Sequence, residues 1–422
     1  MIQALSLVTL IAVFVTATTT PVNMGLLAFV AAFLIGALSG VSLDDVLGFF
    51  PGDVFVLVVG ITLLFGVARV NGTIDLVVAA SLKLVRGRRW AIVWLMFALA
   101  AVLMALGSVL AVGMLAPIAM PIAARYRISP LLMGMMLSHG ALSAAFSPIT
   151  VYGAFTSGMV AKAGLDVGPF VLFAVPFVLN VAFAVVLFLV LGRGLLRRDD
   201  EQVSAIDEID AGGGGGTAVL RKVEVTPRRI LTLSGMAVLL ITTGVFGVDV
   251  GVTAFVIGAS LLLVSPHRHK DSMGDVAWSA VLLVCGMLSY MAVLKENGTL
   301  ALLGEAAAAL GSPLLAALLL CFAVAILSAF GSSIGTLGIA LPLAIPLLGM
   351  GDIGAVGFIV ALGFCSTVVD VSPFSTNGVI VLAQAQVPDK ARFQRQMLAY
   401  GGLVVVAAPL LVWSAVIVPT SL

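Results

Sequence analysis

The chain has 422 residues, of which 61% are hydrophobic and only 10% are charged, so it is too apolar for a protein whose whole surface faces water. A mean hydropathy of +1.23 and repeated apolar stretches of about 20 residues identify an integral membrane protein and exclude a large soluble enzyme domain. The net charge of +1 leaves no basic surplus for binding nucleic acid.

In the first half, apolar stretches predict membrane spans over residues 2–20, 23–40, 53–68 and 170–191. The first of these has no charged segment before it and no cleavage site after it, so we interpret it as a retained span rather than a signal peptide. Residues 71–84 and 297–310 each follow an Asn-Gly turn and are predicted to form interfacial helices.

Residues 90–124 are too short to form two full spans. Two spans and a loop need at least about 40 residues at the rise of an α-helix, yet both ends of this segment are predicted to lie in the cytoplasm. The segment therefore predicts a re-entrant hairpin, with Gly107 and Ser108 at its tip. The following segment, 131–157, contains Gly140, Pro148 and Gly153 and predicts a discontinuous helix.

Residues 192–229 form the only long hydrophilic break. They carry a cluster of charged residues and five consecutive glycines, 212–216, and such a segment cannot bury enough apolar surface to fold. The glycine run follows no strand and lacks the Lys-Ser/Thr ending of a phosphate-binding loop. We interpret the segment as a cytoplasmic linker.

The linker separates two similar halves, 1–191 and 230–422. Five landmarks recur in the same order at offsets of 222 to 226 residues, and the second set begins at Val248, Gly274, Asn297, Leu341 and Ser372. Repeats of this size that are built from spans are typical of secondary transporters. In the second half they predict a hairpin over 312–348, with Gly331, Ser332 and Ser333 at its tip, and a discontinuous helix over 354–385.

Charge predicts that the two repeats are inverted in the membrane. One arrangement places 19 of the 21 Lys and Arg in the cytoplasm and leaves only Lys162 and Lys295 outside. Equivalent loops then face opposite sides, with both termini outside. The predicted fold is an all-α polytopic protein of the inner (plasma) membrane, with about ten transmembrane helices and two re-entrant hairpins in two inverted repeats.

Polar residues gather at the two predicted helix breaks. Seven polar side chains lie within residues 366–377, and Asp370 is the only carboxylate predicted at mid-membrane depth, where ionisable groups are functional by default. The N-termini of half-helices suit a small anion, whereas carbonyl and hydroxyl oxygens suit a small cation. An unperturbed imidazole titrates near neutral pH, so His139 is a candidate proton site together with Asp370. Gly107 and Gly331 are predicted to permit tight hairpin turns.

These motifs resemble those of a known family. The segments Gly72 to Asp75, Ser138 to Gly140 with Phe146 to Pro148, and Thr367 to Gly378 resemble the MatC-like malonate and dicarboxylate carriers, which are grouped with the divalent anion:sodium symporters of the ion transporter superfamily. The resemblance extends over nearly the whole chain. It implies a homodimer with scaffold and transport domains, a substrate held between two hairpin tips and two unwound helices, and elevator-type alternating access.

The residues and the resemblance together define candidate sites. The substrate site comprises Ser108, Ser147, Pro148, Thr150, Ser332, Ser333, Ser372, Pro373, Ser375, Thr376 and Asn377. The coupling-ion site comprises Gly107, Ser108, Ser143, Gly331, Ser332, Thr336 and Asp370. Sodium-coupled relatives carry Asn at both tips, and Asn is absent from both tips here, so sodium and protons both stay open as the coupling ion.

The sequence therefore predicts a secondary active transporter of a small dicarboxylate, such as malonate or a C4 acid, and not an enzyme. It predicts no cofactor, and no metal beyond a coupling sodium ion. Three alternatives stay open at this point. They are a cation/proton antiporter centred on Asp370, a passive anion channel, and an intramembrane hydrolase that pairs Ser147 with His139.

Overall fold

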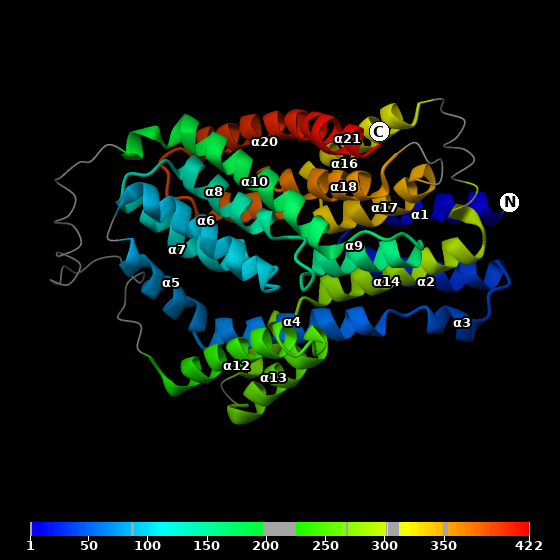
Figure 1. The fold of residues 1–422 in the computed structure, drawn as a ribbon, viewed down its shortest axis with the longest axis horizontal. Coiled ribbons are helices and arrows are strands. Elements are labelled where there is room, and N and C mark those ends of the chain that lie inside the picture. The colour runs from blue at the N-terminus through cyan, green and yellow to red at the C-terminus, as the bar shows by residue number, and fades with distance from the viewer. Residues whose placement is uncertain are drawn as a thin grey trace.

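The computed structural model describes residues 2–85, 88–196, 225–266, 269–300, 302, 312–348 and 353–421. Every regular element within these ranges is helical (Figure 1). The first half contains α1 (Ile2–Thr19), α2 (Met24–Leu38), α3 (Leu43–Gly48), α4 (Gly52–Val70), α5 (Thr73–Leu84), α6 (Arg89–Ala105), α7 (Ala111–Arg125), α8 (Pro130–Ser143), α9 (Val151–Lys162) and α10 (Pro169–Leu191).

The second half contains α12 (Pro227–Gly244), α13 (Val250–Val264), α14 (Trp278–Glu296), α16 (Pro313–Ala329), α17 (Ser333–Leu348), α18 (Ala355–Val368), α19 (Thr376–Gln384) and α20 (Lys390–Val412). Short helices add η1 (Arg193–Leu196), η4 (Lys270–Asp275), a π-helical turn η5 (Trp413–Ile417) and α21 (Val418–Thr420). The first-half segments lie close to the predicted ones, because hydropathy and Pro/Gly breaks are local signals.

Some features of the chain differ from the sequence expectation, and others lie outside the described residues. The short helices α3 and η4 were not expected, and α12 already begins at Pro227, inside the predicted linker of 192–229. Residues 197–224 of that linker lie outside the described residues, as does most of the predicted interfacial helix 297–310. Its counterpart in the first half, α5, follows the Asn71-Gly72 turn as predicted.

Four helical segments of the described chain are long and apolar enough to cross a membrane: Leu43–Val70, Pro169–Leu191, Trp278–Glu296 and Lys390–Thr420. Shorter apolar helices of 10–17 residues accompany them, including α2, α6 and α13. The chain is therefore a polytopic membrane protein.

Two helix pairs cross closely at glycines, α2 with α14 and α4 with α13. A Cβ atom on Gly286 of α14 would lie 2.1 Å from the carbonyl oxygen of Gly25 on α2. A Cβ atom on Gly60 of α4 would lie 2.7 Å from the carbonyl oxygen of Gly251 on α13. Glycine is required at both crossings because the backbones nearly touch, as is common between membrane helices.

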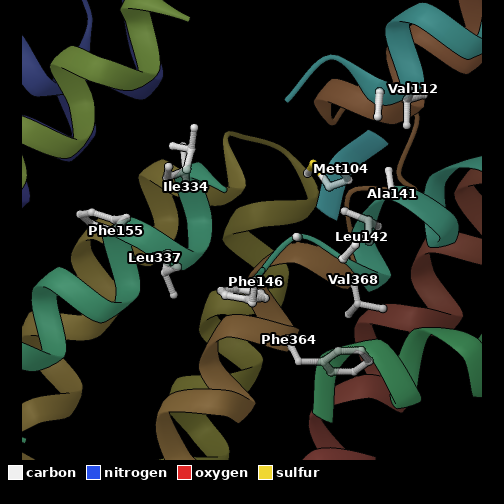
Figure 2. Packing of buried hydrophobic residues seen from close by; sticks show 14 of the residues in the cluster. Met104, Val112, Ala141, Leu142, Phe146, Phe155, Ile334, Leu337, Phe364 and Val368 are labelled. Atoms are coloured by element: carbon white, nitrogen blue, oxygen red, sulfur yellow. The ribbon is translucent and has the colours of Figure 1, made fainter. Parts of the chain in front are cut away.

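The helices α6, α7, α8, α10, α16, α17, α18 and α20 pack into a second group (Figure 1). Figure 2 shows buried side chains from this group around the two helix breaks, among them Met104 of α6, Leu142 of α8 and Val368 of α18. Phe146, just after α8, packs against α18 so closely that a Cβ atom on Gly363 would lie 2.8 Å from its ring. The breaks are thus held in a dense apolar packing, which leaves their polar groups few orientations.

Candidate functional site

The turn of the first hairpin joins α6 to α7 through a left-handed glycine. Gly107 has a φ of +102°, and a Cβ atom there would lie 2.1 Å from the side chain of Ile61 on α4. The backbone N–H of Ser108 then donates to the carbonyl of Leu103 at 2.9 Å. Only glycine fits this turn, both for its φ and for the space available, as the sequence predicted.

The turn of the second hairpin, between α16 and α17, is built differently. Gly331 is not among the left-handed glycines, and an added Cβ atom would meet only the carbonyl of Leu327 at 3.4 Å. Gly331 lies in the turn between the two helices, and this turn forms without a left-handed glycine. A serine shapes this turn instead, because the Ser332 hydroxyl accepts the N–H of Gly335 at 3.3 Å and so caps the start of α17.

Two buried hydroxyls follow that second turn. Ser333 accepts a hydrogen bond from the Ser328 hydroxyl at 3.2 Å. The hydroxyl of Thr336, one turn into α17, is buried and has no partner in the part of the chain that is described. Thr336 thus presents an unsatisfied oxygen close to the hairpin tip.

The two helix breaks are closed by matching hydrogen bonds. In the first, the Thr150 hydroxyl donates to the carbonyl of Ser147 at 2.8 Å. In the second, the Ser375 hydroxyl donates to the carbonyl of Ser372 at 2.7 Å. The Thr150 oxygen also accepts the N–H of Gly153 at 3.0 Å and caps α9.

Several of the predicted hydroxyl ligands are engaged with backbone groups. Ser147 donates across to Ala105 at the end of α6, at 2.8 Å, and Ser143 donates to Gly140 at 2.7 Å. The Ser372 hydroxyl accepts the N–H of Phe374 at 3.4 Å. These groups hold the breaks together, and their hydrogen bonds tie the first break to the first hairpin.

Asp370 lies inside the second break with its side chain buried. One carboxylate oxygen accepts the backbone N–H of Asn377 at 3.5 Å, so the acid faces the first turn of α19. Asn377 is buried beside it, whereas Thr376, the first residue of α19, is exposed.

A cavity of about 780 Å³ lies where the two hairpin turns and the two breaks converge. It is lined by Leu110 at the start of α7, by Val151 and Tyr152 of α9, by Gly331, Ser332 and Gly335 around the start of α17, and by Thr376 of α19. The beginnings of α2 and α14 complete the wall, with Asn23, Met24 and residues 274–280.

Of the predicted site residues, Gly331, Ser332 and Thr376 line this cavity. Ser108 lines a smaller adjoining pocket together with Arg69, Asp275 and Thr62. The remaining predicted residues are not among the lining groups. The buried ones include Ser147 and Asp370, which lie within the two breaks.

His139 lies apart from the cavity in a fully buried network. Its Nδ1 is 2.9 Å from the Oδ1 of Asn180 on α10, and its Nε2 is 2.6 Å from the hydroxyl of Tyr400 on α20. Asn180 uses its amide N–H to donate to Pro176 at 2.9 Å, so its Oδ1 accepts from His139. His139 therefore donates through Nδ1. Burial disfavours the imidazolium form, and in the neutral form Nε2 accepts the Tyr400 hydroxyl.

This network separates His139 from Ser147. Both ring nitrogens are engaged by other residues, and the Ser147 hydroxyl donates to Ala105. A nucleophile and its base must lie within hydrogen-bond reach, so this geometry does not support the Ser147–His139 pair. Asn180 and Tyr400 were missed at the sequence level, although a polar Asn in the otherwise apolar α10 was a detectable signal.

Within the described ranges, no group of three His, Cys, Asp or Glu side chains lies close enough together to hold a metal ion. The three cysteines are buried and unbridged.

The comparisons with known proteins point to transport. Residues 1–145 match the family model of the N-terminus of the dicarboxylate carrier protein MatC. No curated protein matches the chain.

Two solved structures share the fold. The YdaH transporter of Alcanivorax borkumensis is 17% identical, with a TM-score of 0.53 over 87% of this chain and 86% of that chain. MtrF of Neisseria gonorrhoeae, described with a class of antimetabolite efflux pumps, is 13% identical, with a TM-score of 0.55 over 91% of this chain and 84% of that chain. The resemblance to MatC-like carriers is thus confirmed over residues 1–145, within a fold shared with two solved transport proteins.

Proposed function

We propose that this protein is a secondary active transporter of small dicarboxylates, malonate or a C4 acid such as succinate or malate, in symport with sodium or protons. The observation that carries the proposal is the convergence of both hairpin turns and both helix breaks on one cavity of about 780 Å³. That volume falls within the range of small-molecule sites. The match to a dicarboxylate carrier over residues 1–145 supports the same substrate class.

The cavity favours an anion because several helices begin at its wall, four of them at the hairpin turns and the breaks. Leu110 precedes α7, Val151 starts α9, Ser332 precedes α17 and Thr376 starts α19. The first turn of a helix carries a positive partial charge, which suits a carboxylate. One N–H group is already capped at the start of α9, α17 and α19, by Thr150, Ser332 and Asp370 respectively.

We propose that the coupling ion binds behind this cavity, near Asp370 and the hairpin tips. The unpaired Thr336 hydroxyl and the buried carboxylate of Asp370 offer hard oxygen ligands of the kind that a small cation needs. Gly107, Ser108, Ser143, Gly331 and Ser332 are the other proposed contributors.

We further propose that the protein is a homodimer of the inner membrane that works by an elevator-type motion between inverted repeats. The repeat is supported by equivalent contacts in the two halves. The side-chain Oδ1 of Asn71 accepts the backbone N–H of Thr73 at 3.0 Å, and the Oδ1 of Asn297 accepts the backbone N–H of Thr299 at 3.1 Å. The two glycine crossings are also equivalent. An offset of 226 residues takes Gly25 of α2 to Gly251 of α13 and Gly60 of α4 to Gly286 of α14.

The cation/proton antiporter is the weaker alternative. Asp370 is not among the residues that line the cavity, and His139 is held as a neutral imidazole by two partners. A passive anion channel shares the same polar lining, and concentrative uptake under an imposed gradient distinguishes it from a symporter.

Substrate-dependent thermal stabilisation tests the anion site. Malonate and succinate should each raise the Tm of the purified protein. Replacing Ser375, Thr376 and Asn377 with Ala should abolish that rise, and Ser260→Ala, on an exposed face of α13, should keep it. An undiminished rise in the triple variant would remove the second break from the substrate site.

A further inference from the structure

One charged side chain lines the cavity within the described residues, and it is an acid. Asp275 ends the short helix η4 and lies just before α14. Its side chain is only 11% exposed, so little water screens its charge. A negative charge at this place is unexpected in a cavity that is proposed to take a dianion.

Arg69 neutralises this acid from the neighbouring helix α4. Its Nε donates to Oδ2 of Asp275 at 2.9 Å, and its Nη2 contacts Oδ1 of the same carboxylate. A two-point contact of this kind fixes both the distance and the orientation of the pair. Arg69 and Asp275 also line the small pocket that contains Ser108 of the first hairpin tip.

The packing of α4 on η4 holds the two residues together. A Cβ atom on Gly66, one turn before Arg69, would lie 2.8 Å from the carbonyl oxygen of Ser272 and 2.9 Å from the Cβ of Asp275. The backbone of η4 therefore sits directly on α4, which keeps Asp275 within reach of Arg69.

We propose that Arg69 is a specificity-determining residue: by neutralising Asp275 it allows the cavity to accept a doubly charged anion. Like charges brought together at a binding site oppose association, and the opposition grows with the charge of the ligand. Without Arg69, the carboxylate of Asp275 would repel each carboxylate of the substrate. This inference rests on the proposed dicarboxylate transport.

Charge-changing variants in proteoliposomes test the proposal through the KM for succinate. Arg69→Gln keeps a polar, though shorter, side chain and removes the charge. The Asp275 carboxylate, no longer neutralised, would then repel a bound anion several ångströms away. The variant should therefore raise the KM on the order of tenfold for a dianion and roughly threefold for a monoanion. The monoanion is assayed as monomethyl succinate competing for uptake. The maximal rate should stay close to that of the wild type.

Rescue separates a charge effect from a packing effect. The double variant Arg69→Gln with Asp275→Asn should restore the KM for succinate, because both charges are then absent. Arg69→Lys should retain a near wild-type KM because it keeps the positive charge. Lys83→Met, which removes one exposed charge at the end of α5, is the matched control and should leave the KM unchanged.

Two results would overturn this inference alone, provided that the wild type takes up succinate. One is a KM for succinate that stays raised in the double variant. The other is an equal effect of Arg69→Gln on the dianion and on the monoanion. Failure of the wild type to take up any dicarboxylate would overturn the proposed function and this inference with it. The two failures are therefore distinguishable.

Discussion

Thr150 and Ser375 make the same hydrogen bond in the two helix breaks, each donating its hydroxyl to the carbonyl three residues earlier. The acceptors are Ser147 and Ser372, and the two pairs lie 225 residues apart in the sequence. Gly153 and Gly378 pack onto the same two carbonyls. The breaks are therefore closed turns with defined hydrogen bonds, and α9 and α19 begin at fixed places on the cavity wall.

Thr150→Val tests the role of the first break. Valine keeps the shape of the side chain but removes the oxygen that caps α9, so the variant should lose about 1 kcal/mol of stability, as for other helix caps. Thermal unfolding of the purified protein measures this loss as a lower Tm. Thr150→Ser retains the oxygen and should unfold close to the wild-type temperature. Equal Tm values for the two variants would contradict the capping role.

The two hairpin turns should respond differently to alanine. Gly107→Ala places a side chain at a left-handed φ and against Ile61, at a cost on the order of 1–3 kcal/mol for the backbone strain alone. Gly331→Ala meets neither obstacle. Yield of monodisperse protein and its Tm should fall for the first variant and be retained for the second. The opposite order would show that the turns are built differently from this description.

Tyr400→Phe tests the network around His139. Removing the hydroxyl leaves the buried Nε2 of His139 without a partner, which costs about 1–3 kcal/mol. The Tm should fall, while Tyr126→Phe, at the half-buried end of α7, should leave it nearly unchanged. If Tyr400→Phe instead retained the wild-type Tm and changed the coupling ion, His139 would belong to the transport cycle.

Asp370→Asn should separate substrate binding from coupling. Asparagine keeps an oxygen to accept the N–H of Asn377 but removes the charge, so thermal stabilisation by succinate should persist. Accumulation driven by an ion gradient should be lost, because the buried charge is the proposed partner of the coupling cation. Asp166→Asn, in an exposed loop, should accumulate substrate normally. Full accumulation by Asp370→Asn would exclude this acid from coupling.

The helices, their breaks and the hairpin turns could be predicted because their signals are local. Apolar runs of membrane length, proline and glycine positions and the Asn-Gly turns each depend on a few adjacent residues. Equivalent signals in the two halves supported the same elements. Gly107 could be predicted as a turn glycine because it lies at the centre of its hairpin. Gly331 occupies the equivalent place in the second hairpin but has no positive φ, because equivalence within a repeat does not determine a φ angle.

The contacts between distant segments could not be predicted. Arg69 and Asp275 are 206 residues apart, and His139 and Tyr400 are 261 apart. Polar content marked the two breaks as candidate binding sites, but it did not indicate where each hydroxyl points. Ser147, Thr150 and Ser375 donate to backbone carbonyls, whereas Ser332 and Thr376 line the cavity.

Uptake of radiolabelled malonate and succinate into proteoliposomes, with sodium and proton gradients imposed separately, tests the central claim most directly. The proposed symport predicts concentrative accumulation of at least one acid that depends on one of the two gradients and is lost in Asp370→Asn. No uptake of either acid under any gradient would contradict the assignment as a dicarboxylate transporter.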